Sequence, residues 1–222
     1  MDKIERIVDA ALSLAAREPW PAITLSRIAA EAGFGLDDFV GEAHSKAAIV
    51  AAYVRRIDRR LLASLREDPA EGGPHDRLFD VMLRRLEMMA ADKPAVASIL
   101  AGPGAGASEC AELFAAGYES QGWTLAAAGF APQGFRADVI RLGLARIQAQ
   151  ILRVWLEDDD PGLARTMAAL DRLLRDAEDL YQRIERPIGI AMSLYRGFRA
   201  ARRKTDAPPP RPEDEPAYAT AD

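Results

Sequence analysis

The stretch ITLSRIAAEAGFGLDDFVGEAHSK, residues 23–46, decides the fold of the N-terminal part of the chain. The side chain of Thr24 can accept a hydrogen bond from a backbone amide, so a helix is predicted over LSRIAAEA. Gly33 can take the left-handed conformation that ends helices. A short helical segment is then predicted at about 36–42, and a long helix at about 46–66. This order predicts a helix-turn-helix, a motif whose second helix enters the major groove of DNA.

The second half of this stretch has an unusual charge for a segment that meets DNA. It contains Asp37, Asp38 and Glu42, whereas its one basic side chain is Lys46 at the far end. Affinity for DNA depends largely on Lys and Arg side chains that neutralise phosphates, so carboxylates here would add repulsion. We therefore expect the scaffold of the motif without its DNA-reading face.

Composition predicts an all-helical protein. The chain has 222 residues, of which 49% are apolar, and a formal net charge of −5. This charge gives no general attraction to nucleic acid. The chain has one cysteine, Cys110, which excludes a disulfide framework within the chain. One cysteine and two widely separated histidines also cannot form a metal site. The N-terminus has no apolar signal segment, and no window of about 18 apolar residues exists. A cytoplasmic protein is expected.

Helical periodicity continues along the rest of the chain. The acidic turn EDDDP is interpreted as a solvated loop rather than a metal site, with Asp160 as N-cap and Pro161 as the first helical residue. The stretches 68–74 and 101–107 are predicted to be a linker and a flexible break. Helices are predicted at about 3–18, 75–91, 108–128, 134–156 and 161–184, with a further short one opened by Pro94.

The C-terminal segment is basic and then proline-rich. Residues 186–204 carry six basic side chains and no acidic one, beside an apolar side. This pattern favours a membrane-contacting helix, although a helix packed on its own domain or a nucleic-acid contact would also fit. The tail 205–222 is expected to be disordered. The predicted membrane-binding residues are Ile188, Met192, Leu194, Tyr195, Arg196, Phe198, Arg199, Arg202 and Arg203.

The N-terminal stretch IVDAALSLAAREPWPAITLSRIAAEAGF, with Ser45 and Lys46 after it, resembles the start of TetR-family transcriptional regulators. The resemblance implies an all-α, TetR-like fold with a larger helical ligand-binding domain that often dimerises. Members that bind DNA have a Ser-Lys-Gly-Thr-Leu-Tyr-Arg-His-Phe pattern where this chain has Gly35 to Ala43. Phe39 and Val40 are expected to keep the apolar side of that helix. The predicted regions are a helix-turn-helix module (1–46), a ligand-binding and dimerisation domain (47–186), a membrane-contacting helix (187–204) and a tail (205–222).

Residues 141–184 resemble the family of the ubiquinone-biosynthesis accessory lipid-binding protein, the ninth Coq protein. The matching features are Val154-Trp155-Leu156, the acidic turn with Pro161, and Leu170-Asp171-Arg172. The resemblance implies an isoprenoid quinone-like ligand, a terminal membrane-contacting helix, and presentation of the lipid to a di-iron hydroxylase. It places the partner surface at Trp155, Leu156, Met167 and Leu170. Ordinary core packing is the alternative interpretation of these apolar residues.

Apolar side chains at helical spacing outline a candidate lipid pocket. Each of them taken singly is more typical of a core than of a ligand wall, but methionine adapts well to a long flexible ligand. Leu125 and Ile140 belong to the same apolar set. The predicted lipid-binding residues are Met82, Leu86, Met89, Trp123, Phe130, Leu144, Ile147 and Ile151.

No pattern in the chain indicates catalysis. His44 and His75 have no carboxylate or nucleophile partner apparent from sequence, and Cys110 is expected to be a small buried residue. The glycines at 102–106 lack the lysine that follows them in a phosphate-binding loop. Four arginines could form a basic patch on the long helix, but a solvated face with intrahelical pairs to Asp58 is favoured. They are Arg55, Arg56, Arg59 and Arg60.

The sequence therefore supports three hypotheses about function. The leading one is a non-enzymatic, homodimeric lipid-binding accessory protein of ubiquinone biosynthesis, without a cofactor, docked on the inner face of the membrane and with DNA binding not expected. The alternative is a TetR-type, ligand-responsive, DNA-binding repressor. The third is a dimeric helical interaction protein.

Overall fold

A computed structural model of the chain describes residues 2–102, 106–181 and 183. All regular structure within them is helical, which confirms the predicted fold class. The chain divides into one unit of residues 1–176 and another of residues 177–222, and the architecture below is that of the first.

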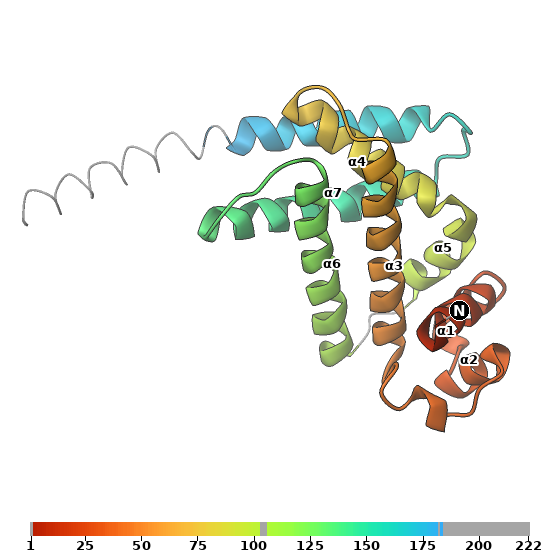
Figure 1. Cartoon of the computed structure of the whole chain (residues 1–222). Coiled ribbons are helices and arrows are strands. Elements are labelled where there is room, and N and C mark those ends of the chain that lie inside the picture. Colours follow the sequence, from red (N-terminus) through yellow and green to blue (C-terminus); the bar gives the residue numbers. More distant parts are fainter. Residues whose placement is uncertain (1, 103–105, 182, 184–222) are drawn as a thin grey trace, which may run out of the picture. The chain divides into compact units, whose positions relative to one another are not determined.

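The N-terminal module is built from α1 (Lys3–Ala15) and α2 (Leu25–Ala32), which pack against each other (Figure 1). Helix α1 buries apolar residues and packs on α2, α3 and α5. It ends at Ala15, earlier than predicted, and the chain turns through the 3₁₀ helix η1 (Trp20–Ala22) to bury Trp20. Pro19 precedes this turn and disfavours a helical conformation for the residue before it.

The predicted boundaries of α2 are confirmed. The Thr24 hydroxyl accepts a hydrogen bond from the backbone N–H of Arg27 at 3.3 Å, as an N-cap does. Gly33 ends the helix with a φ of 72°, in the left-handed region that glycine enters without a steric penalty.

The predicted helix at 36–42 is wrong. The structure has only a three-residue 3₁₀ turn there, η2 (Asp37–Phe39). The Asp38 carboxylate accepts a hydrogen bond from the backbone N–H of Gly35 at 3.2 Å, and Gly41 has a φ of 88°, which no α-helix continues. Phe39 is buried as expected, but Val40 is 85% exposed, so the prediction that it keeps an apolar helix face is also wrong.

Two long helices, α3 (Lys46–Glu67) and α6 (Ala107–Ala127), form the centre of this unit and lie side by side (Figure 1). They run in the same direction, because Ser45 at the start of α3 donates to Glu112 near the start of α6, at 2.8 Å. The Ser45 hydroxyl also accepts from the Ala48 amide at 2.9 Å and so caps α3.

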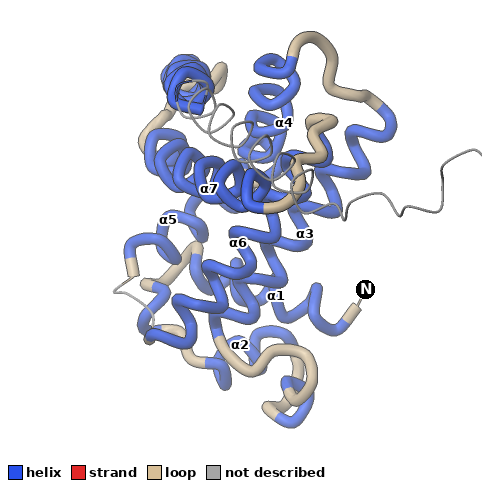
Figure 2. Tube along the Cα trace, turned by 90° about the vertical axis from the view of Figure 1, so that its left-hand side faces the viewer, coloured by secondary structure: helices blue, strands red, loops and turns tan. Residues whose placement is uncertain are grey.

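Other helices pack on this pair, and Figure 2 shows the arrangement from a second side. Helix α4 (Pro74–Met88) contacts α3 and α6, and α7 (Phe135–Leu156) contacts α6 and α4. Helix α5 (Lys93–Ala101) follows the short 3₁₀ helix η3 (Ala90–Asp92) and packs on α1. A further helical segment begins at residue 164 and continues to the end of this unit at residue 176.

The loop after α7 differs from the prediction at its end. Pro161 does not begin the next helix, which starts at residue 164 after Leu163 has taken a φ of 52°. Asp160 nevertheless acts as a cap, since its carboxylate accepts from the amides of Gly162 and Ala164, both at 3.1 Å. Asp158 is buried and accepts from the Thr166 amide at 2.8 Å. The acidic loop is therefore held by its own hydrogen bonds.

Candidate functional site

The turn after Gly33 carries the charges that would face DNA. Asp37 and Glu42 are exposed, and Asp38 forms an ion pair with Lys3 of α1 at 3.0 Å. Their hydrogen bond raises the pKa of the Lys3 ammonium and lowers the pKa of the Asp38 carboxyl. The acidic turn is therefore tied to α1, and its other two carboxylates face solvent.

Three exposed arginines of the module form ion pairs or hydrogen bonds with other residues of the module. Arg17 pairs with Glu31 at 2.6 Å, and Arg27 pairs with Glu18. The Arg6 guanidinium donates to the Ala32 carbonyl oxygen at 2.7 Å. A phosphate would have to compete with these partners.

Lys46 points into the protein. It is the one basic side chain of residues 33–46, at the end of the module. Its ammonium donates to the carbonyl oxygens of Trp20 and Ile23, at 2.8 and 3.1 Å. Burial lowers its pKa. Residues 2–46 contain five basic and eight acidic side chains, so the module has a formal charge of −3. The module thus has the first two helices of the predicted motif, a 3₁₀ turn in place of the next one, and a net negative charge that opposes contact with DNA.

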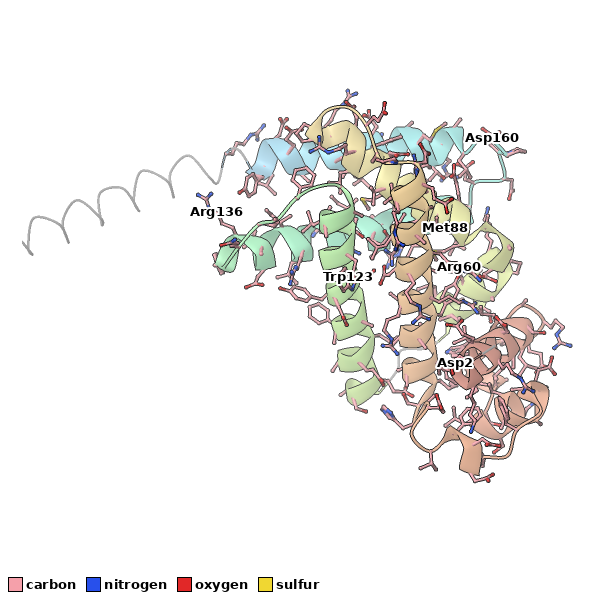
Figure 3. The ribbon with its side chains drawn as sticks, in the orientation of Figure 1. Asp2, Arg60, Met88, Trp123, Arg136 and Asp160 are labelled. Carbon is pink, nitrogen blue, oxygen red and sulfur yellow. The ribbon has the colours of Figure 1, made fainter. Side chains whose placement is uncertain are left out.

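The arginines of α3 do not pair with Asp58, and that prediction is wrong. Arg56 is buried and contacts both Glu5 and Asp9 of α1, and Arg59 pairs with Glu5. Arg55 and Arg60 are exposed. Figure 3 labels Arg60 on α3. Two of the four charges therefore hold α1 against α3 instead of forming a basic patch.

Asp58 instead belongs to a buried polar cluster that sequence reasoning missed. Its carboxylate lies 2.7 Å from the guanidinium of Arg85 on α4 and accepts from the Ser120 hydroxyl of α6 at 2.8 Å. Arg85 also donates to Ser120 and, at 3.4 Å, to Thr124. The cluster joins α3, α4 and α6 within the core. The available signal was that Arg85 stands on the same helical face as the apolar residues around it.

Most of the predicted lipid-binding residues are packed in the core. Trp123, which Figure 3 labels on α6, is the exception. Its surface is 46% exposed, and Phe130 is half-buried. None of the eight lines either of two clefts, of about 520 and 440 Å³, in the described part of the chain. Their role in lipid binding stays a prediction. The buried ones are Met82, Leu86, Met89, Leu144, Ile147 and Ile151.

The predicted partner-binding residues separate into two kinds. Trp155 and Leu170 are buried, which favours the packing interpretation for both, whereas Leu156 and Met167 are half-buried. Trp155 and Met167 both line the larger cleft, between the end of α4 and the loop after α7. The structure therefore brings these two together at a surface, although not as an exposed apolar patch.

The predicted membrane-binding residues, from Ile188 to Arg203, lie outside the described residues. Within the described part, no helix is long and apolar enough to cross a membrane. Cys110 is exposed, so the expectation that it is buried is wrong. Both histidines lie beside carboxylates that the sequence did not indicate: His44 is 3.6 Å from Glu112, and His75 is 3.1 Å from Asp171.

Two solved structures are similar to this chain in fold. A TetR transcriptional regulator from Rhodococcus sp. RHA1 has a TM-score of 0.61 at 17% identity, over 78% of this chain and 93% of that one. The TetR transcriptional regulator from Nitrosomonas europaea ATCC 19718 has a TM-score of 0.62 at 20% identity, over 80% and 99%. No family model and no curated protein sequence matches the chain. The likeness shows that the chain has a TetR-like fold, as predicted.

The buried cluster generates a test of stability. Asp58→Ala should lower the free energy of unfolding by about 3–5 kcal/mol, because it leaves the buried Arg85 charge without its carboxylate. The double variant Asp58→Ala/Arg85→Met should recover part of this loss. Urea unfolding measures both.

Arg84→Met is the matched control for this test. Arg84 is the neighbour of Arg85 but pairs with Asp80 and Asp68 near the surface. Its loss should cost about 1 kcal/mol or less. Equal effects of Asp58→Ala and Arg84→Met would show that the buried pair does not hold the three helices together.

Proposed function

We propose that the protein is a ligand-responsive transcriptional regulator of the TetR type. Both structures described above are regulators with this fold, and the N-terminal module keeps α1, α2 and the turn at Gly33, with a 3₁₀ turn where the second helix of the predicted helix-turn-helix would lie. Nothing in the described residues suggests catalysis. The observation that carries the proposal is the way one helix, α3, connects the module with the rest of this unit.

Helix α3 is fixed at its start and in its middle. At its first turn, Lys46 binds the carbonyl oxygens of the η1 turn in the module. In its middle, Arg56 and Arg59 bind α1, and Asp58 is bonded to Arg85 of α4 and Ser120 of α6. A ligand that displaced α4 or α6 would therefore move α3, and with it the module. This linkage is the arrangement that a ligand-responsive regulator needs.

A second path connects the module with α5. The Ser98 hydroxyl of α5 accepts from the Trp20 amide and donates to the Glu18 carbonyl oxygen, both at 2.9 Å. Both contacts lie at the turn between α1 and α2. A displacement of α5 would therefore also move the turn between α1 and α2.

A second candidate is a lipid-binding accessory protein of ubiquinone biosynthesis, which would present an isoprenoid lipid to a hydroxylase at a membrane. The observation that favours it over a regulator is the acidic turn, because Asp37 and Glu42 face solvent where a regulator would meet phosphates. Both similar structures are transcriptional regulators and neither supports a role in ubiquinone biosynthesis, so this candidate ranks second.

Both candidates would be homodimers. Three apolar side chains on one face of α7, Phe135, Val139 and Leu142, are 77%, 40% and 47% exposed. They follow the i, i+4, i+7 spacing of a helical interaction stripe. A second copy packed on this face would remove them from water.

A DNA-binding experiment tests the regulator proposal. The protein should bind duplex DNA from beside its own gene more tightly than a scrambled duplex, in fluorescence anisotropy at about 0.1 M salt. Asp37→Lys/Glu42→Lys should raise the affinity for both duplexes and steepen the salt dependence by about two units, one for each new phosphate contact. Asp38 is left unchanged because it holds Lys3 and the Gly35 amide.

The matched control for this charge reversal is Glu67→Lys/Glu71→Lys. It changes the net charge equally at exposed positions near the end of α3, away from the module. If wild-type protein does not distinguish the two duplexes, the regulator proposal fails. If the control raises DNA affinity as much as the module variant, the acidic turn is not where DNA would bind.

Native mass spectrometry tests the accessory-protein candidate. Protein purified without detergent should carry an isoprenoid lipid, and it should float with liposomes that contain anionic lipid. Removal of residues 187–204 should abolish flotation while the melting temperature stays unchanged. Lipid-free protein that does not float would rule this candidate out.

Light scattering after size-exclusion chromatography tests the dimer. The wild-type protein should have twice the mass of one chain, and Val139→Glu/Leu142→Glu should have the mass of one chain, because charges cannot be buried unpaired in an apolar interface. Leu36→Glu/Val40→Glu, at exposed apolar positions on the η2 turn, is the control and should stay dimeric. A monomeric wild-type protein would contradict the inference.

A further inference from the structure

The larger cleft lies where α4 ends, α5 begins and the loop leaves α7. Its volume of about 520 Å³ falls in the range of small-molecule sites. Leu83, Leu163 and Met167 contribute apolar wall, and Trp155, which is almost wholly buried, also lines the cleft. An organic molecule with an apolar body would therefore find a surface to cover.

The same cleft is strongly acidic. Four carboxylates line it, and Figure 3 shows one of them, Asp160, on the loop that leaves α7. The only basic side chain in its lining is Lys93, whose ammonium donates to the Asp158 carbonyl oxygen at 2.7 Å and lies 5.6 Å from the Trp155 ring centroid. Lys93 thus braces the loop and leaves the cleft with an excess of negative charge.

The four carboxylates have different tasks. Asp158 accepts from the amide and the hydroxyl of Thr166, at 2.8 and 2.6 Å, and Asp160 caps the following helical segment. Glu87 and Asp159 are exposed, and neither has a hydrogen bond or ion pair with the described residues. Two carboxylates hold the loop, and two face a ligand without a protein cation to neutralise them.

The loop is held in a costly conformation that places apolar surface in the cleft. Leu163 has a φ of 52°, in the left-handed region that a non-glycine residue enters only at a steric cost. Its carbonyl oxygen accepts from the Met167 amide at 2.8 Å, and the hydrogen bonds of Asp158 and Asp160 surround it. These bonds fix Leu163 and Met167 on the same wall.

We propose that this cleft binds a small organic cation with an apolar body, such as an alkylammonium or quaternary ammonium compound. The apolar wall would cover its hydrocarbon part, while Glu87 and Asp159 would neutralise its charge. An anionic ligand would be repelled, and a neutral one would leave both carboxylates unpaired. A bare metal ion is the wrong class, because no group of acidic, histidine or cysteine side chains in the described residues could hold one.

Isothermal titration calorimetry with hexyltrimethylammonium tests the proposal on the full chain. At about 0.05 M salt, where screening is weak, this cation should give a saturable heat. Hexanoate, with the opposite charge, and tetramethylammonium, with no apolar chain, should bind at least tenfold more weakly. Hexanol should also bind more weakly, because it offers no charge to the carboxylates.

Glu87→Gln/Asp159→Asn should weaken binding of hexyltrimethylammonium by about five- to twentyfold, since each exposed ion pair contributes up to about fivefold. Both residues are exposed, so the variant should fold and melt as the wild type does. Glu67→Gln/Glu71→Gln removes the same charge outside the cleft and should leave the affinity unchanged.

Several results would overturn the proposal. The proposal fails if hexyltrimethylammonium gives no saturable heat or if hexanol binds as tightly. It also fails if the cleft variant and the control variant lose the same affinity. Titration involves no DNA, so the outcome is independent of the regulator proposal.

Discussion

The ion pair between Asp58 and Arg85 is the constraint on which the rest of this unit depends. Two charges withdrawn from water must keep their partners, because an unpaired buried charge costs several kcal/mol. The pair is completed by Ser120, so the relative positions of α3, α4 and α6 are fixed together. Apolar packing alone tolerates small shifts between helices, whereas hydrogen bonds to ionised groups specify distance and direction.

Helix α3 transmits this constraint to the N-terminal module. Its first turn holds the module through Lys46, and Arg56 and Arg59 hold α1. The basic residues that a DNA-binding protein could direct at phosphates are here used to join helices. The fold of the module and its affinity for DNA are therefore separate properties, since the first depends on Thr24, Gly33 and buried apolar side chains and the second on surface charge.

The acidic residues of the loop after α7 also have different roles. Asp158 and Asp160 satisfy backbone amides at the start of the following helical segment, which explains why carboxylates occur there. Asp159 and nearby Glu87 have no such structural task in the described residues, yet they line the same cleft. Acidic residues that stabilise a loop and acidic residues that meet a ligand are adjacent in sequence and become distinguishable only through their hydrogen bonds.

Sequence by itself determined the helices, because caps and the spacing of apolar residues act locally. Thr24, Gly33 and the bounds of α3 followed from it, and so did the all-helical, TetR-like fold. It misjudged residues 36–42, where two flanking glycines and an Asp38 hydrogen bond favour a 3₁₀ turn over a helix. Only the tertiary structure decided which charges are buried and with which partner, as for Asp58 and Arg56, and that Trp155 and Met167 meet at a cleft. Such contacts join residues far apart in the chain, and helical periodicity carries no information about them.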